Sequence, residues 1–337
     1  MIRNLPIGKL PAPLLSTLLT NFSCSDDSVI IGPRPGEDAA VIDLGTQYLV
    51  ATTDPITFAT NDIGRYAVHV NANDVACCGA IPRWFLATVL LPEGASEELA
   101  ATVFAQIRAA ADELSVTVVG GHTEVTIGLQ RPLVVGQMMG LVAPQDLITT
   151  GGAKPGDDLI LTKAIALEGT AILAAEKSCD LKDLLSSVEI NDCTSLTITP
   201  GISVVDDALT ARNTGGVHAL HDPTEGGLAT GLAELAEASK VGLLVVESSI
   251  PKVPHCADIC AHFGLDVMGL IASGALLMAN APSHTRTIVD ALSEKGIPAT
   301  VIGSVTDYTA GCKLVRDDGT VRALPSFARD EITKVLG

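Results

Sequence analysis

Three aspartates near the start of the chain have the residue type and placement of a metal site. Asp38 precedes one apolar run, Asp54 closes the next, and Asp74 follows Asn73 late in a segment with helical spacing. Carboxylates at the ends of such elements can converge on one rim of a sheet and hold hard divalent cations, which leave positions open for phosphate oxygens. The alternative for Asp38 and Asp54 is that they are turn and cap residues, roles that aspartate also favours.

A glycine pair followed by two titratable side chains is a second candidate for chemistry. Gly120 and Gly121 come directly after an apolar run, and His122 and Glu124 follow them. Glycines let the backbone approach a ligand closely and present its N–H groups. We therefore expect His122 and Glu124 to contact phosphate or substrate as catalytic residues, with a purely structural histidine as the alternative.

Two further candidates for anion binding lie far apart in the sequence. Asp222 or Thr224 would cap a helix whose first residues, Gly226 and Gly227, expose amides at its positive end. Lys9 follows a glycine near the start of the chain and could close over the phosphates of a ligand as a catalytic residue. The alternative is that Lys9 is an ordinary exposed lysine that binds no ligand.

The elements that must position these residues alternate between strand and helix. In the first half we expect strands at 40–43, 48–53, 116–119 (buried) and 133–142, an apolar run at 84–91, and helices at 62–78 and 96–114. In the second half we expect strands at 159–163, 242–246, 275–279 and 300–302, and helices at 168–177, 201–212, 226–238, 255–263 and 284–295. The Gly-, Pro- and Thr-rich stretch 148–158 predicts a boundary between domains at 1–147 and 148–337. From Asp317 onward the polar sequence predicts a loosely packed tail.

Composition excludes several classes of function. A chain of 337 residues with 47% hydrophobic residues can form two domains with a core in each. Its net charge of −18 argues against a nucleic-acid or anionic-membrane surface, although metal ions can still bridge carboxylates to ATP. Eight cysteines without a CxxC motif, and no uncharged apolar run of about 18 residues, predict a reduced, cytoplasmic protein without a signal peptide or transmembrane helix. Cys256 and Cys260 share a helical face, which we interpret as core packing rather than a zinc site.

Several segments together resemble a known family. GEDAAV, TTD, DIGRYAVHVNANDVACCGAIPRW and GGHTEV, in this order and at this spacing, are similar to the aminoimidazole-ribonucleotide-synthetase (PurM-like) superfamily. In the second half, LTKAIALEGTAILA, HDPTEGGLA and GLDVMGLIASGALLMA resemble HypE-type hydrogenase expression/formation proteins. The likeness spans residues from about 38 to 302.

The resemblance implies a two-domain α/β (α+β) fold. The N-terminal, ATP- and Mg²⁺-binding domains of a homodimer would pair into a β-barrel, and the C-terminal domain would be an α/β sandwich. It implies Mg²⁺ on Asp38, Asp54 and Asp74, and transfer of the γ-phosphoryl group of ATP to a substrate oxygen. The resemblance and the residue patterns together give the expected ATP contacts, which are Asp38, Asp54, Asn73, Asp74, Gly120, Gly121, Asp222, Thr224, Gly226 and Gly227.

The sequence also departs from the HypE-type pattern. Those proteins end in a cysteine that carries a carboxamide, which ATP-dependent dehydration converts to a cyanide-level group. Here the last cysteine is Cys312, within a strand-like run, and Glu168 stands where a histidine is usual. The sequence therefore predicts that this chain does not carry out the cyanide-forming step on a cysteine of its own.

The predicted function is an ATP-dependent phosphotransferase or dehydratase-type enzyme of the HypE-like group. Its acceptor would be a small molecule or a group on a carrier protein, and a maturation partner protein is an expected associate. The alternatives are a small-molecule kinase resembling thiamine-monophosphate kinase, or a non-catalytic nucleotide-binding partner in metallocentre assembly.

Overall fold

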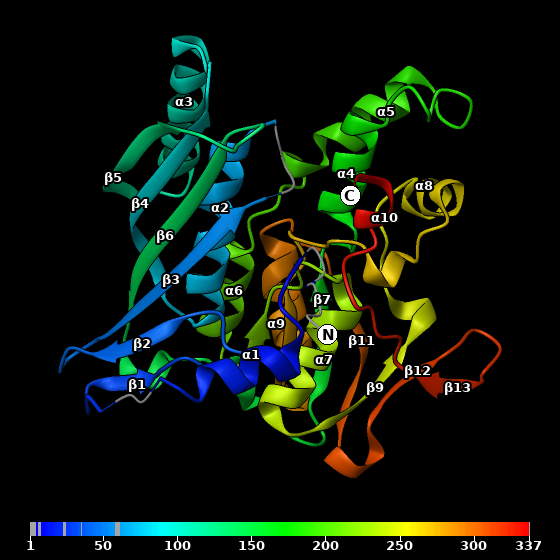
Figure 1. Ribbon diagram of the computed structural model, residues 1–337. Coiled ribbons are helices and arrows are strands. Elements are labelled where there is room, and N and C mark those ends of the chain that lie inside the picture. The colour runs from blue at the N-terminus through cyan, green and yellow to red at the C-terminus, as the bar shows by residue number, and fades with distance from the viewer. Residues whose placement is uncertain (1–4, 6–7, 23–24, 35, 58–60, 337) are drawn as a thin grey trace, which may run out of the picture. The chain divides into compact units, whose positions relative to one another are not determined.

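The computed structural model describes residues 5, 8–22, 25–34, 36–57 and 61–336. The chain forms two compact units (Figure 1). The first unit comprises Cys24–Gly32 and Asp38–Leu147, and the second comprises Met1–Ser23, Pro33–Glu37 and Ile148–Gly337. Each unit combines one sheet with helices, which confirms the predicted α/β class. The assignment of functional domains to 1–147 and 148–337 stays a prediction.

The first unit is a six-stranded sheet with two helices on one face (Figure 1). The strand order is β1-β2-β3-β6-β4-β5. The strands are β1 (Val29–Ile31), β2 (Ala40–Asp43), β3 (Tyr48–Ile56), β4 (Ile81–Pro92), β5 (Thr117–Thr126) and β6 (Leu133–Val142), and the helices are α2 (Ile63–Cys77) and α3 (Glu97–Glu113).

Local sequence signals explain the two helices of this unit. Ser96 caps α3 at the start of the predicted helix, because its side chain accepts a hydrogen bond from the amide of Leu99. Gly64 lets α2 and α3 touch, since a Cβ atom there would lie 2.6 Å from the carbonyl oxygen of Val103. The Ser96 cap therefore fixes where α3 begins, and Gly64 lets α2 and α3 approach closely.

The prediction for β5 was wrong in two respects. This strand was expected to be buried and to end before Gly120, but it continues to Thr126 and nine of its ten residues are exposed. It pairs in parallel with β4 on one side and forms an edge of the sheet on the other. The apolar run indicated a buried strand, but β-branched residues also occur on an edge strand that nothing covers within its own unit.

The second unit is built on a seven-stranded sheet in the order β13-β12-β9-β11-β7-β10-β8. Its strands are β7 (Asp158–Thr162), β8 (Val217–His221), β9 (Gly242–Val246), β10 (Leu277–Asn280), β11 (Ala299–Thr306), β12 (Cys312–Val315) and β13 (Val321–Ala323). Its α-helices are α1 (Ala12–Leu19), α4 (Leu167–Glu176), α5 (Ser187–Thr194), α6 (Val205–Thr214), α7 (Gly227–Ser239), α8 (Cys256–Phe263), α9 (Pro282–Glu294) and α10 (Thr333–Leu336). The short 3₁₀ helix η5 (Val267–Gly269) follows α8.

Both faces of the interior strand β7 are buried. Leu159 and Leu161 join the core with Leu228 and Leu232 of α7, whereas Ile160, on the opposite face, is also fully buried. Helices α6 and α9 pack on each other, and α9 contacts β7 and β11. A strand covered on both faces reads as an unbroken apolar run, which is why β7 was predictable.

The end of the chain is not the loosely packed tail that its polarity predicted. Asp330, Glu331 and Ile332 are only 3%, 5% and 0% exposed. The carboxylates of Asp330 and Glu331 accept hydrogen bonds from main-chain amides of distant residues, which offsets the cost of burying them. Among the described residues, no helix has the length and apolar character needed to cross a bilayer.

Candidate functional site

Helix α2 buries polar side chains along with apolar ones. His69, Asn71, Asn73 and Asp74 are between 0% and 4% exposed. Burying polar groups is costly unless they are hydrogen-bonded, so such a helix needs matching partners on the surface that it covers. For Asn71 and Asp74 those partners lie on the neighbouring strand β3, whereas His69 lies 3.3 Å from Glu113 of α3.

Two pairs of residues form the contact between α2 and β3. Asn71 and Asp74 are three residues apart and share a helix face, while Thr52 and Asp54 are two apart and share a strand face. The amide of Asp54 donates to Asn71 Oδ1 at 2.9 Å, and Asn71 Nδ2 donates back to the Asp54 carbonyl at 3.3 Å. The Thr52 hydroxyl lies 2.8 Å from Asp74 Oδ2. Gly136 of β6 leaves room for Asn71, because a Cβ atom there would lie 2.3 Å from Asn71 Nδ2.

The same threonine links the third aspartate to this contact. The Thr52 hydroxyl is also 2.8 Å from the carbonyl oxygen of Asp38, so it contacts both Asp38 and Asp74. The structure thus brings Asp38, Asp54 and Asp74 to one part of the first unit. Thr52 was not singled out from the sequence, although its position two residues before Asp54 on a strand was a usable signal.

The glycine pair and its followers lie elsewhere in the first unit. Gly120, Gly121, His122 and Glu124 all belong to β5, and strands β6 and β4 separate β5 from β3. His122 Nε2 lies 3.2 Å from Glu124 Oε2, and both side chains are exposed. A Cβ atom on Gly121 would lie 2.0 Å from the Ala87 carbonyl, so glycine is needed here for the pairing with β4.

Lys9 lies against α7 in the second unit. Its main-chain amide donates to Glu225 Oε2 at 3.3 Å, and its ammonium is 3.7 Å from Glu234 Oε1. The other carboxylate oxygen of Glu234 lies 3.0 Å from Nε2 of the buried His221. The lysine predicted to cover phosphates is therefore joined to two acidic side chains of its own unit.

The start of α7 differs from the prediction. Neither Asp222 nor Thr224 caps this helix with its side chain; the N-cap is Gly226, in the left-handed conformation. Asp330 takes the capping role, because its Oδ2 accepts the Gly226 amide at 2.6 Å. Asp330 Oδ1 also accepts the amides of Ile271 and Ile332. The chain therefore supplies its own carboxylate where an anionic ligand was expected.

A second buried carboxyl lies near Asp330. Burial raises the pKa of Glu168 to about 7, hydrogen bonds from Ser273 oppose the rise, and the like charges of Asp330 and Glu225 add to it. Burial also raises the pKa of Asp330 to about 6, against three hydrogen bonds from main-chain amides. Within the described residues, Glu168 Oε2 has no hydrogen-bond partner. In the sequence, Glu168 stood out only because a histidine is usual at its position. Its burial beside Asp330 and Glu225 could not be predicted, because those residues belong to distant segments.

Comparison with known proteins identifies the family. Residues 36–142 match the AIR synthase related protein, N-terminal domain, and residues 154–311 match the C-terminal domain of the same family. Carbamoyl dehydratase HypE of Cupriavidus necator is 30% identical over 271 residues, covering 77% of this chain and 73% of the relative. A hydrogenase expression/formation protein of Methanocaldococcus jannaschii is 29% identical over 314 residues, covering 90% of each chain.

Solved structures show the same fold. A HypE–HypF complex superimposes with a TM-score of 0.77 at 23% identity, covering 94% of this chain and all of that chain. HypE in complex with ATP superimposes with a TM-score of 0.73 at 24% identity, covering 94% of this chain and 91% of that chain. The chain therefore belongs to the AIR synthase related family, in the group that contains the HypE hydrogenase expression/formation proteins.

Proposed function

We propose that this chain is an ATP-dependent enzyme of the dehydratase type, which uses the γ-phosphoryl group of ATP to activate the oxygen of a carboxamide. The observation that carries the proposal is the polar contact between α2 and β3, which involves the carboxylate of Asp74 and the main chains of Asp38 and Asp54. A relative named carbamoyl dehydratase and a related HypE solved with ATP support the chemistry and the nucleotide.

The residue type of the three aspartates suits Mg²⁺ as their ligand. Carboxylate oxygens are the donors that Mg²⁺ prefers, and it is held by few protein groups so that phosphates complete its shell. Thr52 holds the Asp74 carboxylate, and Asn71 holds the main chain of Asp54, so the donors are positioned by the fold itself. Mg²⁺, when bound, would neutralise phosphate charge and orient the γ-phosphoryl group.

The remaining residues would bind and position the substrates. We propose that Asn73, Gly120, Gly121 and Gly227, with Asp222 and Thr224, contribute to nucleotide binding, and that His122, Glu124 and Lys9 contact phosphate or acceptor. The amide of Gly226 is left out of this set, because it donates to Asp330. Transfer to the amide oxygen forms one P–O bond and breaks the bond to ADP. Departure of phosphate then breaks the C–O bond as the nitrogen loses two protons, which leaves a nitrile-level product. A carrier protein is the proposed source of the amide, because one structural relative was solved as a HypE–HypF complex.

Carboxamide-dependent ATP turnover tests this function. We expect a peptide with an S-carbamoyl cysteine to stimulate ADP release and to lose the mass of one water. The N,N-dimethylcarbamoyl peptide is the matched control, because its nitrogen cannot lose two protons. Stimulation by hydroxyl compounds with a phosphorylated product would identify a kinase instead, and ATP binding without stimulation by any acceptor would identify a non-catalytic partner.

We also propose that two copies of this chain associate through β5. Val118, Val119 and Val125 are 45–59% exposed on this edge strand, and an uncovered apolar edge tends to pair with another chain. We expect light scattering to give twice 34.7 kDa. Val119→Lys should shift the protein toward monomer, whereas Val188→Lys, at an exposed position of α5, should not. A mass of 34.7 kDa that is independent of concentration would contradict the dimer.

A further inference from the structure

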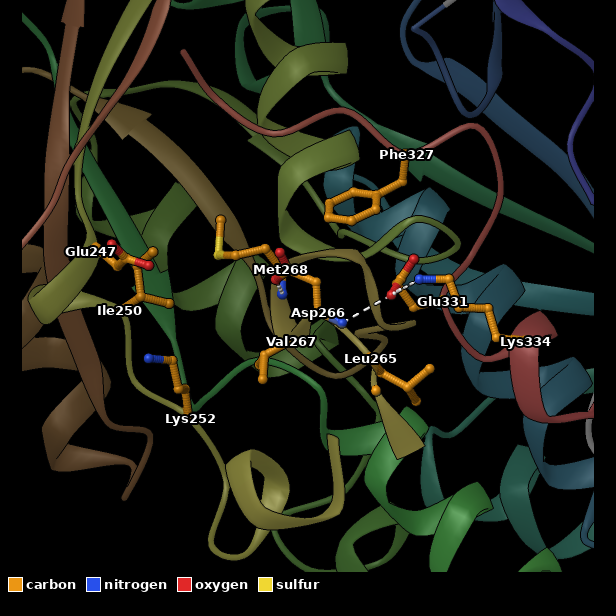
Figure 2. Close-up of a pocket in the computed structure, with 11 residues that line it drawn as sticks. Glu247, Ile250, Lys252, Leu265, Asp266, Val267, Met268, Phe327, Glu331 and Lys334 are labelled. Atoms are coloured by element: carbon orange, nitrogen blue, oxygen red, sulfur yellow. Dashed lines mark hydrogen bonds and ion pairs between the residues drawn. The ribbon is translucent and has the colours of Figure 1, made fainter. Parts of the chain in front are cut away.

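A cavity of about 580 Å³ lies in the second unit, outside the residues assigned above (Figure 2). It lies beside β9, the α8–η5 segment and the end of the chain. This volume is in the range of about 300–1,000 Å³ that is typical of small-molecule sites. The residues that line it are Glu247, Ile250, Lys252, Gly264, Leu265, Asp266, Val267, Met268, Phe327, Glu331 and Lys334.

Part of the wall is apolar. Ile250, Leu265 and Met268 are buried, and the partly buried Val267 and Phe327 pack against the core of the unit. Figure 2 shows the Phe327 ring and the Met268 side chain on neighbouring parts of the wall. A polarizable thioether and an aromatic ring adapt to flat or hydrocarbon groups, so this wall suits an apolar body.

The acidic groups of the wall already have partners. Glu331 Oε2 lies 2.6 Å from the Lys334 ammonium and accepts the Asp266 amide at 2.9 Å. Glu247 lies 3.7 Å from Arg316 and 3.6 Å from Arg322. The Asp266 side chain accepts the Met268 amide at 2.9 Å.

Lys252 is the other lysine of the cavity wall, besides Lys334. Among the described residues it forms no ion pair, although the chain carries 39 acidic side chains against 21 lysines and arginines. Its side chain is exposed, and in Figure 2 it lies on the other side of the cavity from the Glu331–Lys334 pair. An ammonium that no neighbouring carboxylate holds can take an anionic group of a ligand.

We propose that this cavity binds a small monocarboxylate with an apolar body. The carboxylate would lie on Lys252, and the body would pack against Ile250, Met268 and Phe327. A phosphate ester or polyphosphate does not fit, because one cation cannot balance it beside three carboxylates. A cationic ligand does not fit either, because Lys252 repels it while the acids are already paired.

Titration with 3-phenylpropionate tests the site, and 3-phenylpropanol, 3-phenylpropylamine and phenyl phosphate serve as matched probes. Lys252 is exposed, and an exposed ion pair changes affinity by up to about fivefold, so we expect the carboxylate to bind about fivefold more tightly than the alcohol. The amine and the phosphate should bind more weakly than the carboxylate.

Two variants locate the interaction. Lys252→Met keeps the apolar stem and should reduce carboxylate affinity to that of the alcohol, with the alcohol unchanged. Lys182→Met, at a lysine outside the cavity, should change neither. The proposal is overturned if the wild-type protein shows no saturable carboxylate binding, binds carboxylate and alcohol equally, or keeps its carboxylate affinity in Lys252→Met. The comparison of probes on the wild-type protein holds even if a variant misfolds.

Discussion

Asp74→Asn is expected to weaken the binding of Mg-ATP at least about 30-fold while leaving the fold intact. Removing one charge from a buried, hydrogen-bonded charge pair costs about 2–5 kcal/mol, and each 1.4 kcal/mol is a factor of about ten in affinity. Asparagine has the same shape, and its carbonyl oxygen can still accept the Thr52 hydroxyl 2.8 Å away. The loss would therefore report on the missing charge rather than on a disrupted helix. Asp54→Asn should act in the same direction.

Calorimetric titration with ATP in excess Mg²⁺ measures this effect. Asp112→Asn is the matched control, because it removes the same charge from the same unit at a side chain that is 73% exposed on α3. Circular dichroism and melting temperature check that each variant folds. An Asp74→Asn protein that binds Mg-ATP within about twofold of the wild type would remove Asp74 from the site, since even one weak charged hydrogen bond is worth more than that.

Glu168→Gln is expected to stabilise the protein above pH 7 and to have little effect below pH 5. Burial raises the pKa of Glu168 from 4.5 to about 7, so the folded chain holds a proton there that the unfolded chain has released. Between these pH values each pH unit costs the native state about 1.4 kcal/mol. The stability from the protonated form is complete below pH 4.5 and is lost as the pH rises through 7, a total of about 3 kcal/mol. Glutamine stays neutral and avoids that loss.

Urea denaturation between pH 5 and 8.5 measures the difference in unfolding free energy. Glu176→Gln is the control, because it changes the same residue type at the exposed opposite end of α4. Burial also raises the pKa of Asp330 to about 6, so this residue too makes the protein less stable as the pH rises. Asp330 is unchanged in both variants, so its contribution is present in each. If the unfolding free energies of the wild type and of Glu168→Gln depend on pH equally, the buried carboxyl of Glu168 is not the source of the stability lost at high pH.

The elements that the sequence predicted well are those specified by adjacent residues. Strands β2 and β3 and helix α3, which were expected at 40–43, 48–53 and 96–114, depend on turn chemistry and spacing within a few residues. The proposed aspartate site was predictable only in part. The residue types of Asp38, Asp54 and Asp74 indicated metal ligands, but the role of Thr52 depends on the register between a strand and a helix 22 residues away.

The predictions that were wrong concern contacts between distant segments. The cap of α7 comes from Asp330, 104 residues beyond Gly226, so no local pattern could indicate it. The same contact buries the end of the chain, which its polarity had predicted to be loose. Strand β5 looked buried because its residues are apolar, but no neighbour within its unit covers it.

Titration of the wild-type protein with ATP, in Mg²⁺ and in EDTA, tests the aspartate site most directly. The carboxylates of Asp38, Asp54 and Asp74 would repel a triphosphate unless a divalent cation lay between them. The proposed site predicts saturable ATP binding in Mg²⁺ and affinity at least about 30-fold weaker in EDTA. Equal affinity in the two solutions would contradict it.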